Sequence, residues 1–313
     1  YTSAANVELP VSTGDGSSTT TFILTLTVAN PNEDLTDVNF GYILNLFDEN
    51  YTPPSTPASS FTFSYSDTDL AASITKFVGS ETEVVIPSTV EYNGATYKVT
   101  AIADGGYSTG AFYNSNITSV VIPDTVTSIG YYAFQNCRSL TSVNFGENSQ
   151  LTRIGTCAFH SCYSFTSITI PSSVTSIGSY AFSYCYALAE VYNYSSLTIT
   201  AGSSSNDGDL GQHAKVVYNA SDLTGVKPAT RIKDNNGVRY YDDGENTVVA
   251  LYPLSKDITT VSLDSRTTEI QLGAFSNCNN LTSVDFGENS QLTSIGNYAF
   301  SSCYSLTSIT ILD

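Results

Sequence analysis

Cysteine and histidine side chains come close together once in the sequence, in an arrangement that could bind zinc. Cys157, His160 and Cys162 form a Cys-x2-His-x-Cys group, and thiolate and imidazole are the donors that zinc prefers. A zinc site requires all its ligands to converge on one point. The place of Cys162 in the repeat described below commits its side chain to the core, so we expect no metal here.

Two other places offer groups for catalysis or for a hard cation. His213 lies beside Gly211 and Gln212 with no Ser or Cys nucleophile motif nearby, and we expect it to be a surface residue. Asp207-Gly-Asp209 and Asp242-Asp243-Gly-Glu245 could bind calcium through carboxylate oxygens, but neither matches an EF-hand loop. We expect solvated turns there. The sequence therefore predicts no enzyme and no cofactor.

The charge balance narrows the classes of partner. The chain of 313 residues has 29 acidic and 11 basic residues, which gives a net charge of −18. That charge repels phosphate backbones and anionic lipid headgroups, so neither nucleic acid nor an anionic membrane is an expected partner. No apolar run reaches the length of a membrane-spanning helix. The chain opens YTSAANVELP, without Met, and we expect it to be a piece of a longer, secreted protein.

An internal repeat with a period near 23 residues decides the architecture. The unit from Thr166 reads TSITIPSSVTSIGSYAFSYCYAL, and the unit from Thr282 reads TSVDFGENSQLTSIGNYAFSSCYSL. Its most regular feature is the pair Ala-Phe, which recurs at residues 111–112, 133–134, 158–159, 181–182, 274–275 and 299–300.

Each unit has the pattern of one coil of a solenoid. In Phe165-Thr-Ser-Ile168-Thr-Ile170 the apolar residues end in strict alternation, which predicts a short strand. The Ala-Phe-x2-Cys spacing predicts a tight helical or 3₁₀ corner. A single coil cannot bury its own apolar face, so the coils must stack and share a lengthwise core. Ladders of equivalent residues follow. We expect one continuous, nearly fully buried stripe that includes Phe134, Phe159, Phe182 and Phe300.

Five of the six cysteines share one position of the repeat, and their side chains should fill a small apolar slot as reduced thiols. These are Cys137, Cys162, Cys185, Cys278 and Cys303. Cys157 is out of phase, at a position that Tyr fills in other coils, and we expect it to be partly exposed.

The repeating unit resembles the BspA-type leucine-rich repeat of bacterial cell-surface proteins. The matching residues follow LTSVxIPxxVTSIGxxAFxxCxxL and cover about 82–190 and 258–313. The resemblance implies a β-rich leucine-rich-repeat solenoid of parallel short strands with tight corners, at the cell surface or outside the cell. It also implies adhesion or recognition of a protein of a host or neighbouring cell. Carbohydrate binding through exposed Tyr and Asp or Asn is the alternative.

Two regions depart from the repeat. Residues 1–60 lack it and should form a small N-terminal β segment or cap, with strands at Thr21–Val28 and Asn39–Phe47. The solenoid should occupy 61–313, with an irregular, loop-bearing stretch at about 190–257. Turn signals at Asp234–Gly237 and Asp243–Asn246 predict a hairpin or meander within that stretch.

Tyrosine is the most prominent candidate for a recognition surface, with 22 copies and no Trp. Tyr offers a large contact area at low entropic cost, and two repeat positions carry it three times each. They are Tyr132, Tyr180 and Tyr298, and Tyr163, Tyr186 and Tyr304. We also expect Thr307–Ile311 to form an uncovered strand, through which the chain could self-associate.

Overall fold

The computed structural model describes residues 4–12, 19–27, 54–203, 207–223, 230–307 and 309. The chain divides into two compact units, 1–53 and 54–313. In the first unit, strands β1 (Ala4–Ser12) and β2 (Thr19–Thr27) pair antiparallel. Strand β2 confirms the first strand expected near the N-terminus, whereas the second, at Asn39–Phe47, lies outside the described residues.

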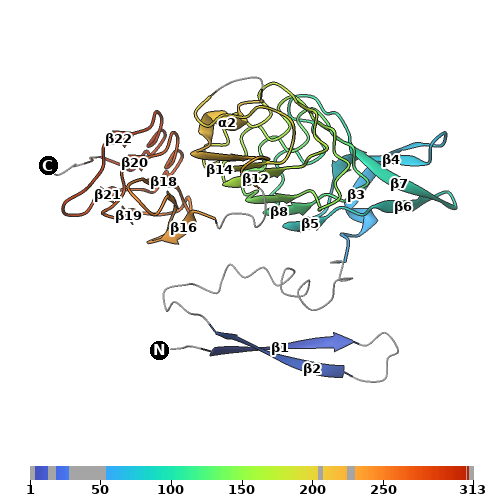
Figure 1. Ribbon diagram of the computed structural model, residues 1–313, viewed down its shortest axis with the longest axis horizontal. Helices are drawn as coiled ribbons and strands as arrows, with labels where there is room; N and C mark the ends of the chain where they lie inside the picture. The colour runs from blue at the N-terminus through green and yellow to red at the C-terminus, as the bar shows by residue number, and fades with distance from the viewer. Residues whose placement is uncertain are drawn as a thin grey trace. The chain divides into compact units, whose positions relative to one another are not determined.

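The second unit is a solenoid of short parallel strands and tight corners, which confirms the predicted fold class (Figure 1). Its first part, residues 54–223, is called the first arm, and residues 230–307 are called the second arm. Each coil contributes one strand to each of two sides. Parallel pairing in register, such as Ile154 with Ile129 and Ile177, places equivalent residues of successive coils directly above one another.

The first arm has one long sheet and two shorter ones. The long sheet follows the order β13-β11-β9-β7-β4-β3, with β6 also paired to β7, and the shorter sheets follow β10-β8-β5 and β12-β14-β15. The arm also contains the 3₁₀ turn η2 (Ala58–Ser60) and the short helix α2 (Leu210–His213). The strands are β3 (Phe61–Ser66), β4 (Ala71–Phe77), β5 (Glu83–Val85), β6 (Thr89–Tyr92), β7 (Ala95–Ile102), β8 (Ser119–Val121), β9 (Ser128–Ile129), β10 (Ser142–Asn144), β11 (Arg153–Ile154), β12 (Ser167–Ile170), β13 (Ser176–Ile177), β14 (Glu190–Asn193) and β15 (Val216–Asn219).

The second arm starts with an antiparallel meander, as the turn signals predicted. Strand β18 then pairs parallel with β20, so the meander passes directly into the next coils. The strands are β16 (Ile232–Asn235), β17 (Val238–Asp242), β18 (Val248–Pro253), β19 (Thr260–Ser262), β20 (Glu269–Ile270), β21 (Ser283–Asp285) and β22 (Ser294–Ile295).

Each arm contains a hairpin closed by an Asn-Gly turn. Asn93 and Gly94 connect β6 to β7, and Asn236 and Gly237 connect β16 to β17. All four residues have positive φ, between 49° and 80°, which is the conformation of a type I′ turn. The irregular stretch therefore contains the same type of hairpin turn as the first arm.

The corners are chains of tight turns. The N–H groups of Ala133, Gln135 and Cys137 each donate to the carbonyl three residues earlier. Tyr132 and Asn136 have positive φ, which interrupts the regular φ/ψ values of a helix. The expected 3₁₀-type spacing is thus present, and left-handed residues turn the chain back toward the next strand.

A glycine directly after the short Ser-Ile or Arg-Ile strand allows the coils to stack closely. A β-carbon built on Gly155 would lie 2.7 Å from the carbonyl carbon of Gly130 in the preceding coil. On Gly178 it would lie 2.4 Å from the backbone nitrogen of Thr156. Backbone atoms cannot move aside as a flexible side chain can, so a larger residue at either position would force neighbouring coils apart.

We expect Gly155→Ala to lower the free energy of unfolding by about 2–3 kcal/mol, because the added methyl group forces two coils apart. The matched control is Gly106→Ala, whose β-carbon meets only the Thr109 hydroxyl at 3.1 Å. Urea unfolding followed by far-UV circular dichroism measures both. Equal stability of the two variants would contradict the account of coil spacing.

Burial confirms the phenylalanine ladder in the first arm but not its continuity. Phe112, Phe134, Phe159 and Phe182 are at most 1% exposed, and neighbouring rings stack with centroids 4.6–5.2 Å apart. The expectation of one continuous stripe is wrong. Phe182 donates its N–H to the carbonyl of Gly208, and this next coil carries no Phe after that glycine.

The ladder resumes in the second arm with Phe275, which is fully buried and stacks on Phe300 at 5.4 Å. Phe300 is only partly buried, contrary to our expectation, because it belongs to the last described coil and Phe275 covers it from one side. The solenoid therefore has two separate main cores, one in each arm. A smaller apolar cluster that includes Ala189 and Leu251 joins the arms.

The in-phase cysteines are buried and free, as predicted. The thiols of Cys137, Cys162 and Cys185 each donate to the carbonyl oxygen of the Phe in the preceding coil, at 3.0–3.2 Å. Cys303 does the same to Phe275 at 3.1 Å. The same hydrogen bond from Cys to the Phe carbonyl of the preceding coil thus recurs in both arms. The strand expected at Thr307–Ile311 lies largely outside the described residues.

Candidate functional site

The Cys-His-Cys group does not converge on a common point. The Cys162 thiol points into the core and donates to the Phe134 carbonyl, whereas Nδ1 of His160 lies 2.9 Å from the Ser161 hydroxyl. Within the described ranges, no group of three or more His, Cys, Asp or Glu residues is placed to hold a metal ion. Cys157 is 8% exposed, so the expectation of partial exposure is wrong, and its side chain contacts that of Tyr132.

The cysteine thiols are kept protonated by burial. Desolvation raises the pKa of Cys137 and Cys185 to about 12 and that of Cys278 to about 11. A nucleophilic or metal-binding cysteine needs the thiolate form at neutral pH. These side chains therefore serve packing rather than chemistry.

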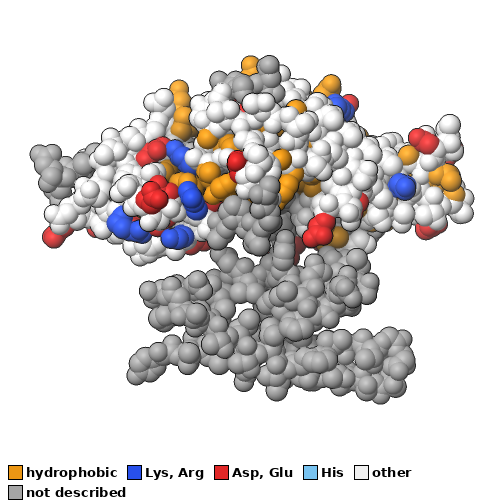
Figure 2. Space-filling view, viewed as in Figure 1, with side chains coloured by type: hydrophobic (Ala, Val, Ile, Leu, Met, Phe, Trp, Pro, Cys, Tyr) orange, Lys and Arg blue, Asp and Glu red, His pale blue; other side chains and the backbone are white. Residues whose placement is uncertain are grey.

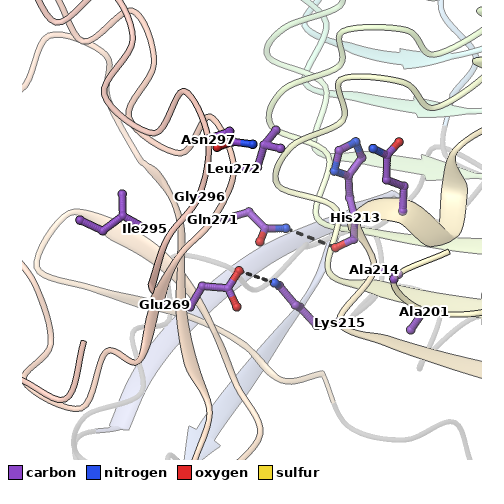
Figure 3. A pocket seen from close by; sticks show the side chains of 12 residues that line it. Ala201, His213, Ala214, Lys215, Glu269, Gln271, Leu272, Ile295, Gly296 and Asn297 are labelled. Carbon is purple, nitrogen blue, oxygen red and sulfur yellow. Dashed lines mark hydrogen bonds and ion pairs between the residues drawn. The ribbon is translucent and has the colours of Figure 1, made fainter. Parts of the chain in front are cut away.

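His213 is buried rather than exposed, which corrects the sequence-based expectation. It is 5% exposed, and desolvation lowers its pKa to about 4. The residue follows the irregular loop after β14, where no repeat phase was available to predict burial. Its backbone carbonyl accepts a hydrogen bond of 3.2 Å from Gln271 of the second arm (Figure 3).

His213 and Gln271 line a cavity of about 630 Å³ between the arms. Lys215 and Glu269 form an ion pair of 2.7 Å across it, so its principal charges are already matched (Figure 3). Asp207 and Asp242 were expected in solvated turns, but they are 3% and 4% exposed. Asp242 is held by ion pairs to Lys233 and Arg266, and Asp207 accepts the N–H of Gly211.

The six tyrosines of the predicted recognition surface fall into different environments. Tyr180, Tyr298 and Tyr304 are 60%, 70% and 82% exposed. Tyr132 is partly buried, and so are Tyr163 and Tyr186, whose rings stack on each other with centroids 5.7 Å apart.

Arg138 extends this pair into a stack of three. Arg138, Tyr163 and Tyr186 follow the Cys of three consecutive coils, so parallel stacking of the coils brings them into line. The Arg138 guanidinium lies 5.5 Å from the Tyr163 centroid. Desolvation, together with the phenols of Tyr163, Tyr184 and Tyr298, raises the pKa of Tyr186 to about 12. A cation on one side and a ring on the other hold Tyr163 in place.

This stack forms one wall of a cavity of about 300 Å³, which we call the junction cavity. Residues of the second arm form the opposite wall, among them Tyr252, Leu254 and Lys256. Tyr252 connects the two walls, because its hydroxyl donates a hydrogen bond of 3.3 Å to the carbonyl of Ser164 in the first arm. A β-carbon on Gly273 would lie 2.5 Å from the Tyr186 ring, so only glycine permits this approach.

The charge of the junction cavity is opposite to that of the chain. Arg138 and Lys256 line it, and none of its described lining residues is Asp or Glu. Outside the cavity, five basic side chains of the described residues form ion pairs with acids: Arg153, Lys215, Lys233, Arg239 and Arg266. Figure 2 shows Lys and Arg gathered beside Asp and Glu over the region of β16, where Lys233 and Arg266 pair with Asp242.

Part of this site could have been found from the sequence. Arg138 stands at the same repeat position as Tyr163 and Tyr186, and that position is readable from the spacing after Cys. Tyr252 and Lys256 carry no such signal, because they belong to the segment between the two blocks of repeats. Their place at the cavity depends on how the two arms meet.

These features define a class of protein, a β-solenoid repeat scaffold with a small aromatic and basic cavity where its arms join. The BspA type leucine-rich repeat region matches residues 107–210 and 251–313 in six copies, slightly more than half of the chain. The chain belongs to this family of leucine-rich-repeat proteins.

Solved structures of similar proteins come from several bacteria. A leucine-rich cell-surface protein of Faecalibacterium prausnitzii is 26% identical over 83% of this chain and 77% of its own, with a TM-score of 0.37. A leucine-rich-repeat protein of Bacteroides capillosus is 35% identical over 45% of this chain and 98% of its own, with a TM-score of 0.38. The search of curated proteins found no match. Among the described residues, no helix has the length and apolar character needed to span a bilayer.

Proposed function

We propose that this chain is an extracellular recognition protein of a bacterial cell surface that mediates adhesion by binding a protein of a host or neighbouring cell. The observation that carries the proposal is the junction cavity with its Arg138–Tyr163–Tyr186 stack. Tyr and Arg are enriched at the energetic centres of protein interfaces, and pre-ordered side chains lose little entropy on binding. Membership of a family of repeat scaffolds supports the proposal.

The two faces of the Tyr163 ring favour a protein over a glycan as the ligand of the junction cavity. Sugar rings bind aromatic residues by stacking on an open face. At Tyr163 the neighbouring coils supply Arg138 on one side and Tyr186 on the other, so neither face is open. Hydroxyl groups and ring edges remain available, and these suit polar and apolar groups of a protein partner.

The test is a comparison of two binding panels with the full chain, one of extracellular-matrix and surface proteins and one of glycans. We expect binding to at least one protein. In the Tyr163→Ala/Tyr186→Ala variant its affinity should fall at least about tenfold, as for the loss of an interface hot spot. The matched control is Tyr107→Ala, a 75% exposed tyrosine outside the cavity, which should bind unchanged. Binding to glycans alone, or equal loss in both variants, would refute the proposal.

A further inference from the structure

The junction cavity contains two cations that the protein itself does not neutralise. Arg138 and Lys256 form no ion pair with a carboxylate in the described part of the chain. Arg138 lies against the Tyr163 ring, and the Lys256 ammonium donates to the carbonyl of Ser276 at 3.0 Å. Both cations retain donor capacity for an anionic group.

Among the described residues, Arg138 and Lys256 remain without an acidic partner although the chain has many more acidic than basic residues. With 29 acidic and 11 basic residues, most cations could find an internal partner. At physiological salt, charges more than about 8 Å from the cavity are largely screened. An anion inside it would therefore respond mainly to the cations in contact with it, and the cavity wall supplies no opposing carboxylate.

Size and apolar lining indicate what carries the anionic group. The volume of about 300 Å³ is at the small end for ligand sites, so the cavity accommodates a side chain rather than a large ligand. Leu251, Pro253 and Leu254 supply apolar contacts beside the cations. Tyr163 has Arg138 on one ring face and Tyr186 on the other, which disfavours a sugar acid stacked on that ring.

We infer that the junction cavity binds an Asp or Glu side chain of an acidic peptide segment, with the carboxylate held by Arg138 and Lys256. The inference rests on the proposed function, because it assigns the chemistry of the protein partner at the same site. Arg138 offers a planar fork of donors that matches a carboxylate, and the stack on Tyr163 fixes the plane of that fork.

The test uses the full chain and an array of N-acetylated, C-amidated octapeptides in matched pairs, with Asp or Glu at the centre of one member and Asn or Gln in the other. Oligogalacturonates are tested in parallel as a source of sugar carboxylates. We expect bound peptides to prefer the acid by about tenfold or more. This preference should disappear in Arg138→Gln/Lys256→Gln.

The control is Lys76→Gln/Lys98→Gln, which removes the same charge from β4 and β7, outside the cavity, and should retain the preference. Equal binding of acid and amide peptides, equal loss in both double variants, or binding of oligogalacturonates without peptides would overturn the inference. A protein partner whose binding depends on Tyr163 and Tyr186 would leave the proposed function standing in each of these cases.

Discussion

Replacing Phe159 by Ala should lower the free energy of unfolding by about 3–5 kcal/mol, the largest single effect that we expect in this protein. Phe159 is fully buried, and its ring lies 5.0 Å from that of Phe134 and 5.2 Å from that of Phe182. Removing it leaves a cavity in the middle of the first-arm ladder. The backbone around it cannot close the gap, because Phe159 is hydrogen-bonded to the next coil at Ala181.

The matched control is Phe300→Ala at the same repeat position. Phe300 is partly buried and stacks on Phe275, so its loss should cost clearly less. The chain has no Trp, and far-UV circular dichroism in urea is therefore a suitable measurement. A Phe159→Ala variant as stable as Phe300→Ala would show that the ladder is not the main source of stability in the first arm.

Acidification should weaken the protein through His213 by as much as about 3 kcal/mol. Desolvation lowers the pKa of the folded-state imidazole from 6.5 to about 4, although Asp209 opposes this shift and Lys215 adds to it. Between these two pH values, the unfolded chain binds a proton that the folded chain does not. The stability due to neutral His213 is therefore complete above about pH 6.5, falls as the pH drops toward 4, and is lost below that.

Comparison of the wild type with His213→Gln isolates this contribution. The variant should lose the part of the pH dependence that lies between pH 6.5 and 4. The chain has only one other histidine, His160, so His160→Gln is a matched control, and the two imidazoles can be assigned by NMR from the two variants. An imidazole of His213 that titrates near 6.5, or equal pH dependence in wild type and His213→Gln, would contradict the burial of this side chain.

The repeat phase made many of the structural predictions possible. In a parallel solenoid, residues one period apart occupy equivalent environments, so the burial of Phe134, Phe159 and the in-phase cysteines follows from spacing alone. Cys157 shows the limit of that argument. Its position carries an exposed Tyr in two other coils, Tyr180 and Tyr298, but the shorter Cys157 side chain does not reach solvent and contacts Tyr132 instead.

Outside the repeat, phase gives no information. The burial of His213 and Asp207 was missed because the loops after β14 have no equivalent coil to compare with. The break in the phenylalanine ladder has the same cause, since Gly208 takes the place where the pattern would supply Ala before the next Phe. Of the site, the alignment of Arg138 with Tyr163 could be read from the sequence, whereas the contribution of Lys256 depends on the meeting of the arms.

Recognition should take place at the junction cavity, and hydrogen exchange with a bound protein partner tests this most directly. In the complex, the account predicts slower amide exchange in residues 138–139, 163–164 and 251–254, which line the cavity from both arms. The hairpins β3–β4 and β6–β7 of the first arm should exchange as in the free chain. Protection confined to these hairpins, with unchanged exchange around the cavity, would contradict the claim.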